Sequence, residues 1–296
     1  MSVSEKIVFP NTPVSDGKTL KMLCLTSSFG IDTTELLCNV ALEQGATDVV
    51  IGRLYSSGCR LERHIQCAMD PEETYEVYYK STTGDWDRHE NVPLLPVLKE
   101  EDWDIIYIQQ GASTAALPED YEDYIERLVA FLDEHKTNPN ARYVWNLTWA
   151  YQSDSQQRVF VEDFNSDQMA MYNALLSTLK EKVLTKPYFS VVIPTGTAIQ
   201  NARTSYFGDH LCKDTFHLNN LGRVIGAYTA WSALTGKHVT EVKLPNPISS
   251  RELRRSAVNL TEDDRKVVLE SVHNAIANPM QVTQSQYTVK PEYPDA

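Results

Sequence analysis

The segment KMLCLTSSFGID, residues 21–32, places a short apolar run directly before a turn rich in hydroxyl groups. An apolar run of this length, bounded by turn residues, is typical of a buried strand. Four similar runs, DVVIGRLY, DIIYIQ, RYVWNL and FSVVIP, begin at Asp48, Asp104, Arg142 and Phe189. We expect these five runs to form a parallel sheet, because longer amphipathic stretches separate them.

The stretches between these runs have the apolar spacing of helices. One predicted helix face contains residues at positions i, i+3, i+4 and i+7, namely Ile125, Leu128, Val129 and Leu132. The same spacing recurs from Met169 to Val183 and from about Asn220 to Thr235. Gly236 follows the last of these regions, where a glycine commonly ends a helix. We expect three helices here.

The alternation of strands and helices predicts an α/β protein, folded as a three-layer α/β/α sandwich without an internal boundary. The segment YEVYYKSTTGDWD, residues 75–87, interrupts the alternation, because its Tyr and Val residues flank a TTGD turn as they would in a hairpin. We expect the folded domain to span residues 21–277, with an N-terminal extension over 1–20 and a polar tail over 278–296.

The composition limits the partners. The 296 residues include 27 Lys and Arg against 40 Asp and Glu, a formal net charge of −13 that opposes binding to nucleic acid or to an anionic membrane. There is no apolar run of about 18 residues, and the first residues lack a secretory signal pattern, so we expect a cytoplasmic protein. The five cysteines lack CxxC spacing, which favours reduced thiols. Composition leaves the oligomeric state open.

Polar residues follow the ends of the expected strands, where ligands bind in parallel sheets. Ser28 follows the first strand, before a helix that we expect to begin near Asp32. There its hydroxyl can point into the cleft, or it can merely cap the helix. Asp214 and His217 share the short DTFH turn, so the carboxylate can hold one ring nitrogen while the other faces the cleft. A serine nucleophile requires such a base, and the three residues together favour nucleophilic catalysis.

Two other loops offer donors for an oxyanion hole. Gly58, in SSGCRLERH, lacks a side chain, so its N–H can approach a substrate closely. QQGAS offers the carboxamide of Gln109 or Gln110, and we prefer Gln110 because it lies nearer the loop. The alternative is that Gly58 only forms a turn and that both glutamines are strand-end residues.

Three further residues are candidates for contacts with the substrate. Gln109 lies at the end of a strand, and His64 could line the cleft. Trp149, in the loop after the fourth strand, could stack on a sugar, although core packing is equally consistent with its position.

A dense acidic and histidine cluster offers an alternative chemistry. Asp209, His210, Asp214 and His217 could ligate a divalent metal. The sequence has no HxH or HExxH spacing there. Asp214 and His217 also fit better as the partners of Ser28, so we expect no metal. Cys59 could be a nucleophile, but nothing in its spacing places a base beside it.

Taken in order, TSSFGID, SSGCRLERH, DIIYIQQGAS and DTFHLNNLG resemble the four blocks of the SGNH (GDSL-like) hydrolase superfamily. Longer segments, including VWNLTWAYQ and VIPTGTAIQNAR, resemble one bacterial subgroup of it, the DUF4886 family. The resemblance covers roughly residues 21–237. It implies a flavodoxin-like parallel sheet of about five strands and an ester hydrolase. Ser28 would be its nucleophile, His217 its base and Asp214 the residue that orients the base, while the Ser28 and Gly58 amides and a third-block side chain would hold the oxyanion.

Two positions depart from the superfamily pattern. Thr26 and Ser27 precede Ser28, where the first block usually has Gly-Asp or Gly-Asn, so the turn that presents the nucleophile differs. The third block has Gln109 and Gln110 before Gly111 instead of an Asn after Gly, closer to the QGES pattern of sialate-type acetylesterases.

The resemblance therefore implies a serine esterase without a metal or organic cofactor. Its partner would be a small-molecule or oligosaccharide ester, and we expect acetyl groups on a carbohydrate. Two alternatives belong to other classes: an inactive carbohydrate-binding protein on the same scaffold, and a metal-assisted hydrolase that uses the Asp/His cluster.

Overall fold

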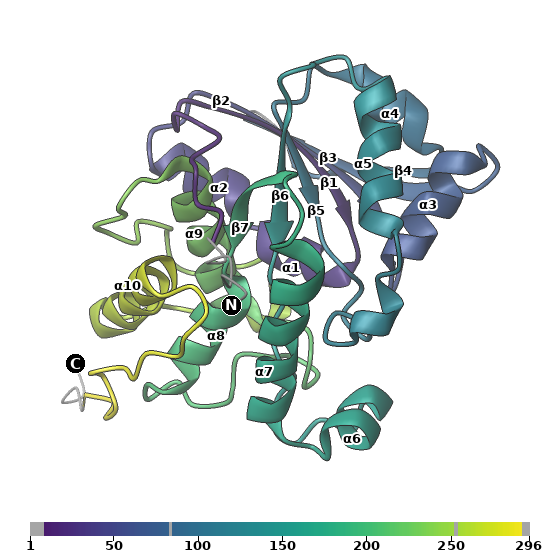
Figure 1. The fold of residues 1–296 in the computed structure, drawn as a ribbon. Helices are drawn as coiled ribbons and strands as arrows, with labels where there is room; N and C mark the ends of the chain where they lie inside the picture. The colour runs from purple at the N-terminus through teal and green to yellow at the C-terminus, as the bar shows by residue number, and fades with distance from the viewer. Residues whose placement is uncertain (1–8, 83–84, 252–253, 292–296) are drawn as a thin grey trace, which may run out of the picture.

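The computed structural model describes residues 9–82, 85–251 and 254–291, which form an α/β protein around a mostly parallel seven-stranded sheet (Figure 1). All five expected strands are present. The strands lie in the order β4-β3-β2-β1-β5-β6-β7. They span Thr19–Thr26 (β1), Asp48–Tyr55 (β2), Tyr75–Ser81 (β3), Asp87–Val92 (β4), Ile105–Ile108 (β5), Arg142–Asn146 (β6) and Phe189–Ile193 (β7).

The expected number of about five strands is wrong, because the predicted hairpin joins the same sheet. Strand β3 pairs antiparallel with β2, and β4 pairs antiparallel with β3, so two strands extend one edge. Thr83 and Gly84, the centre of the expected TTGD turn, lie outside the described residues. The other five strands are parallel and have the order β2-β1-β5-β6-β7, which is that of a doubly wound sheet.

Helices cover both faces of the sheet, and Figure 1 shows α3, α4 and α5 gathered on one side. These three span Leu61–Met69, Leu94–Glu100 and Tyr124–His135. The other face carries α1 (Ser28–Thr34), α2 (Leu37–Glu43), α8 (Thr195–Arg203), α9 (Asn220–Thr235) and α10 (Glu262–Ala277), which pack on one another. Between β6 and β7 come α6 (Arg158–Phe164) and α7 (Gln168–Thr178), and α7 continues as a π-helical turn over Leu179–Val183. Short 3-10 turns occur at Pro118–Asp120 and Arg254–Ser256.

The predicted helices are present, but the helix that follows β1 begins earlier than expected. Helix α9 has the predicted limits, and Gly236 ends it in the left-handed conformation with φ 65°. Helix α1, however, begins at Ser28 and not near Asp32. The reason is local: Ser27 is extended and acts as the N-cap residue, and its carbonyl accepts the N–H groups of Gly30 and Ile31. The hydroxyl-rich turn is therefore the first turn of the helix.

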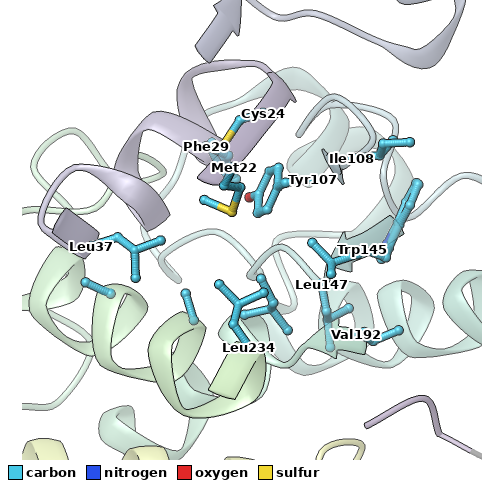
Figure 2. Close-up of a cluster of buried hydrophobic side chains, with 14 of the residues drawn as sticks. Met22, Cys24, Phe29, Leu37, Tyr107, Ile108, Trp145, Leu147, Val192 and Leu234 are labelled. Carbon is cyan, nitrogen blue, oxygen red and sulfur yellow. The ribbon is translucent and has the colours of Figure 1, made fainter. Parts of the chain in front are cut away.

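The core lies on both sides of the central strand. Figure 2 shows Met22 and Cys24 of β1, Tyr107 of β5, Leu37 of α2 and Leu234 of α9 among its buried side chains. Because both faces of β1 are covered, its residues 22–25 are all apolar and buried, without alternation, as is usual in parallel sheets. The sheet is thus a rigid support for the loops at its edge.

The register brings three loops to the same edge. In the pairing of β1 with β2, Thr26 lies opposite Tyr55, and in that of β1 with β5, Leu25 lies opposite Ile108. The chain that follows β1, β2 and β5 therefore leaves the sheet at neighbouring points. This edge is where the sequence places Ser28, Gly58 and the two glutamines.

Both ends of the described chain pack on the expected domain. Asn11 forms a bridge with Val191 of β7, and the N–H of Thr283 donates to Asn201 of α8. Residues 1–8 of the expected extension and 292–296 of the expected tail lie outside the described residues. In the described part of the chain, no helix is both long and apolar enough to cross a membrane.

Candidate active site

Three side chains form a hydrogen-bonded chain at the carboxyl end of β1. Ser28 Oγ lies 2.7 Å from His217 Nε2, and His217 Nδ1 lies 2.8 Å from Asp214 Oδ2. The backbone N–H of His217 donates to the other carboxylate oxygen, Oδ1, at 2.8 Å. The geometry suits the tautomer with the proton on Nδ1, which leaves Nε2 free to accept the serine proton. The structure therefore brings together the three residues that the sequence singled out.

A buried glutamine supports the turn that presents Ser28. Gln109 Nε2 donates to Ser27 Oγ at 3.0 Å, and Gln109 Oε1 accepts the hydroxyl of Tyr107 at 2.7 Å. Gly30 makes this packing possible, because a Cβ there would lie 1.6 Å from Thr26 Oγ1. The amide of Ser28 occupies the first helical position, where no intrahelical acceptor exists, so it is available to a ligand.

A small loop holds Asp214 and His217 in place. Cys212 and Leu218 form an antiparallel bridge, and the N–H of Lys213 donates to the His217 carbonyl at 2.8 Å. Inside the loop, Thr215 has φ 73°, an unfavourable conformation for a β-branched residue. The N–H of Gln152 donates to its carbonyl at 2.8 Å. Backbone strain of this kind persists only where the surroundings hold it.

Asp32 joins the helix of Ser28 to the loop of His217, a function that sequence reasoning missed. Its carboxylate accepts the N–H of Leu218 at 2.8 Å and Nε of Arg223 at 2.8 Å. Asp32 and Arg223 are both fully buried. The sequence did contain a signal for this ion pair, because Arg223 is a charged residue within an otherwise apolar stretch of α9. Buried charges are rare unless they are paired.

Aromatic rings enclose the imidazole of His217. Phe29 and Phe216 lie against it, with ring centroids 5.7 and 4.1 Å away. Trp149 stacks on Phe29 at 4.1 Å and donates its indole N–H to the Phe216 carbonyl at 2.8 Å. Trp149 is fully buried, so it supports the wall of the site from behind, and the expectation that it stacks on a sugar is wrong.

The environment of Asp214 keeps its carboxylate charged. Partial burial raises the pKa, but the hydrogen bonds from the His217 side chain and backbone outweigh it, so the pKa of Asp214 lies below its usual value. An ionised carboxylate here stabilises the positive charge that the imidazole acquires when it takes a proton.

The glutamines lie beneath the site rather than on its surface. Gln110 Oε1 accepts the N–H groups of Leu61 and Gly111, each at 2.9 Å, and Nε2 donates to the Asp120 carbonyl at 2.9 Å. Gln110 and Gln109 are both fully buried. The Gln110 carboxamide therefore holds backbone groups, and the Gln109 carboxamide holds the side chains of Ser27 and Tyr107. This differs from the expected oxyanion donor at Gln110 and the expected substrate contact at Gln109.

Gly58 occupies an exposed turn after β2, with φ 60° and no neighbour within 4 Å of a Cβ built there. Its loop adjoins that of β5, since a Cβ on Gly111 would lie 2.8 Å from the carbonyl oxygen of Cys59. The turn thus stands at the same edge as Ser28, with room for a ligand beside its backbone.

His64 and Cys59 belong to the interior. His64 is fully buried, and its Nδ1 lies 2.8 Å from the hydroxyl of Tyr75. Burial, helped by the charge of Arg63, lowers the pKa of His64 to about 3. Burial also raises the pKa of the Cys59 thiol, so it stays protonated. The expectation that His64 lines the cleft is therefore wrong, and Cys59 lacks the character of a nucleophile.

The four residues of the Asp/His cluster, Asp209, His210, Asp214 and His217, do not surround a common point that could hold a metal ion. Asp209 accepts the N–H of Ser153 at 2.7 Å and lies 2.8 Å from Nε of Arg203, whereas Asp214 and His217 are bonded to each other. Among the described residues, no three His, Cys, Asp or Glu side chains are grouped closely enough to hold a metal ion. All five cysteines are free.

Comparisons with known proteins show which family the chain resembles. The model of a domain of unknown function, DUF4886, matches residues 21–261. The crystal structure of a DUF4886 family protein from Bacteroides uniformis is similar, with 30% identity and a TM-score of 0.79 over 90% of this chain and 98% of that one. A putative GDSL-like lipase from Parabacteroides merdae is more distantly similar, with 13% identity and a TM-score of 0.41 over 78% of this chain and 99% of that one. No curated protein matches.

Proposed function

We propose that this chain, which belongs to the DUF4886 family, is a serine esterase that hydrolyses small acyl esters. The observation that carries the proposal is the chain of short contacts from Ser28 Oγ through His217 to Asp214. A serine hydroxyl is a poor nucleophile until a positioned base removes its proton, and this arrangement supplies that base.

The proposed reaction has two halves. Ser28 Oγ attacks the ester carbonyl while His217 Nε2 takes the hydroxyl proton, and Asp214 stabilises the resulting imidazolium. The tetrahedral intermediate collapses, the ester C–O bond breaks, and His217 returns the proton to the departing alcohol. Water then attacks the acyl-enzyme by the same route and releases the acid.

The negative charge that develops on the carbonyl oxygen needs N–H donors. We assign this role to the backbone amides of Ser28 and Gly58. Ser28 lies at the start of α1, and Gly58 lies in an open turn at the same edge of the sheet. Gln110 is not part of this assignment, because its side chain is already bonded to backbone groups.

For the substrate we propose an acetyl ester on a carbohydrate. The support is the resemblance of the third block, Gln110 with Gly111, to that of sialate-type acetylesterases. This is an analogy of family and not of geometry.

The test compares turnover of 4-nitrophenyl acetate by wild type, Ser28→Ala and Ser177→Ala, a matched control on the exposed side of α7. We expect Ser28→Ala to lose on the order of a thousandfold or more, with Ser177→Ala unchanged. A serine-reactive fluorophosphonate should add its mass to the Ser28 peptide of the wild type alone.

Equal turnover by wild type and Ser28→Ala would reject the mechanism. Activity that survives Ser28→Ala but disappears with a chelator would instead favour a metal-assisted hydrolase. Binding of acetylated oligosaccharides without any turnover or labelling would favour a binding protein.

A further inference from the structure

A pocket lies on the face of the sheet that carries α1, beside the β3–β4 hairpin. Its floor is a row of cross-strand neighbours, Arg53 of β2, Tyr78 of β3 and Arg88 of β4, which point to the same face because they are directly paired. Its walls include Ile31 and Trp86. The volume of this pocket is about 160 Å³. An adjoining cavity, which Trp86 also lines, has a volume of about 400 Å³.

This pocket begins close to the nucleophile. Ile31, in its wall, is three residues after Ser28 on the same helix. Side chains three positions apart on a helix are neighbours, about 5–6 Å apart at Cβ. One part of a substrate can therefore reach the pocket while its ester group is at Ser28.

The charge of the pocket is opposite to that of the chain. The described residues that line the two cavities include five cations against two carboxylates, Glu35 and Asp85, although the whole chain has a net charge of −13. The cations are Arg53, Lys80, Arg88, Arg251 and Arg254.

Three of these cations already have carboxylate partners. Arg53 pairs with Glu35 at 3.0 Å, Lys80 lies 3.9 Å from Asp85, and Arg88 pairs with Glu76 and Glu90 outside the pocket, each at 2.9 Å. Arg251 and Arg254 differ, because no carboxylate of the described residues lies within 4 Å of either guanidinium. Among the described residues, the pocket therefore retains two positive charges without a carboxylate partner.

Arg53 provides a second, independent sign of a ligand. It is 2% exposed; its Nε donates to Thr34 and its Nη1 to Glu35, but its Nη2 has no partner among the described residues. The ring of Trp86 lies over this guanidinium, 3.4 Å from its central carbon. A buried N–H of a cation without an acceptor is costly, so an oxygen from a ligand would satisfy it.

The remaining contacts hold Arg251 in place. Its backbone N–H donates to Glu35 at 3.2 Å, and its Nη1 donates to the Trp86 carbonyl at 3.0 Å. Each carboxylate oxygen of Glu35 therefore already accepts a hydrogen bond, Oε2 from Arg53 and Oε1 from the backbone N–H of Arg251. The free edge of the Arg251 guanidinium remains for an anion, which its planar fork can bind through two parallel hydrogen bonds.

We propose that this pocket binds a negatively charged oxygen group, carboxylate or phosphate, on the sugar of the ester substrate, and this inference rests on the proposed esterase function. Arg251 and Arg254 bind the anion, and Trp86 and Tyr78 pack against the sugar ring. The substrate class is therefore an acyl ester of an acidic sugar.

Binding is tested without catalysis. Ser28→Ala protein is titrated by calorimetry at low salt with glucuronate, glucose 6-phosphate and glucose. We expect at least one anion to bind and glucose not to bind, and the anion that binds tells a carboxylate site from a phosphate site. Adding Arg251→Gln and Arg254→Gln should weaken binding tenfold or more, whereas the matched control Arg127→Gln, on α5 across the sheet, should not. Equal binding of glucose and both anions, absence of binding, or equal affinities in all variants would overturn the proposal.

A second measurement links the pocket to the ester. The ratio of kcat/KM for acetylated glucuronate to that for acetylated glucose should fall tenfold or more in Arg251→Gln/Arg254→Gln, and it should not change in Arg127→Gln. If both esters change equally, the pocket is not a substrate subsite. If no ester is hydrolysed and Ser28 is not labelled, the esterase proposal fails, and the titration alone decides whether the pocket binds anions.

Discussion

The carboxylate of Asp32 accepts the backbone N–H of Leu218 at 2.8 Å and thereby attaches the loop that carries His217 to the helix that carries Ser28. Asp32 is four residues after Ser28, and Leu218 directly follows His217. The distance between Ser28 and His217 is therefore set by a buried contact outside the three proposed catalytic side chains. A rigid support of this kind is what an active site needs to hold its geometry.

Replacement of Asp32 should weaken both the fold and the site. Asp32→Asn keeps the volume but removes the negative partner of the buried Arg223 guanidinium, and breaking such a pair costs about 3–5 kcal/mol. We expect the free energy of unfolding, measured with urea, to fall by about that amount, and kcat to fall with it. Asp163→Asn, on the exposed side of α6, is the control. Equal stability of the two variants would show that the pair does not support the fold.

Asp214→Asn should reduce kcat without unfolding the protein. The amide cannot stabilise the imidazolium as a carboxylate does, but the side chain of Asp214 is 43% exposed, so water replaces part of the lost interaction. We expect kcat for 4-nitrophenyl acetate to fall by roughly 10- to 1000-fold with KM nearly unchanged. A variant with the turnover of the wild type would remove Asp214 from the proposed mechanism.

Acid should destabilise the protein through His64. Its pKa is about 3 in the folded protein and about 6.5 in an unfolded chain. Between these values the unfolded state binds a proton that the folded state does not, so stability falls as the pH falls. The contribution of His64 between pH 7 and pH 5 is about 2 kcal/mol.

The measurement is urea unfolding at both pH values for wild type, His64→Gln and the exposed control His89→Gln. The loss on acidification should be smaller by about 2 kcal/mol in His64→Gln, and His89→Gln should behave as the wild type. The same pH dependence in all three proteins would contradict the burial of a neutral His64.

Two glycines should respond in opposite ways to alanine. At Gly30 a Cβ would lie 1.6 Å from Thr26 Oγ1 and 2.9 Å from Gln109 Oε1, so Gly30→Ala should destabilise the fold by about 1–3 kcal/mol and lower the proposed esterase activity. At Gly226 of α9 the nearest atom would be 3.4 Å away, and Gly226→Ala should stabilise by about 0.5–1 kcal/mol. Unfolding curves and turnover of both variants test this contrast, which fails if the two behave alike.

The sequence by itself determined the five parallel strands, the limits of α9 and the pairing of Asp214 with His217, because each depends on local periodicity or on residues in a single turn. It also singled out Ser28, since a polar residue directly after a buried strand must lie at the edge of the sheet.

Only the tertiary structure decided which polar residues face the site. Gln109, Gln110, Trp149 and His64 all occur in the expected loops and elements, yet each is buried beneath the surface. Likewise, Asp32 and Arg223 meet across 191 positions, and the hairpin pairs with β2 rather than standing apart. Burial and partnership depend on what the rest of the chain packs against a residue, and no pattern of nearby residues contains that information.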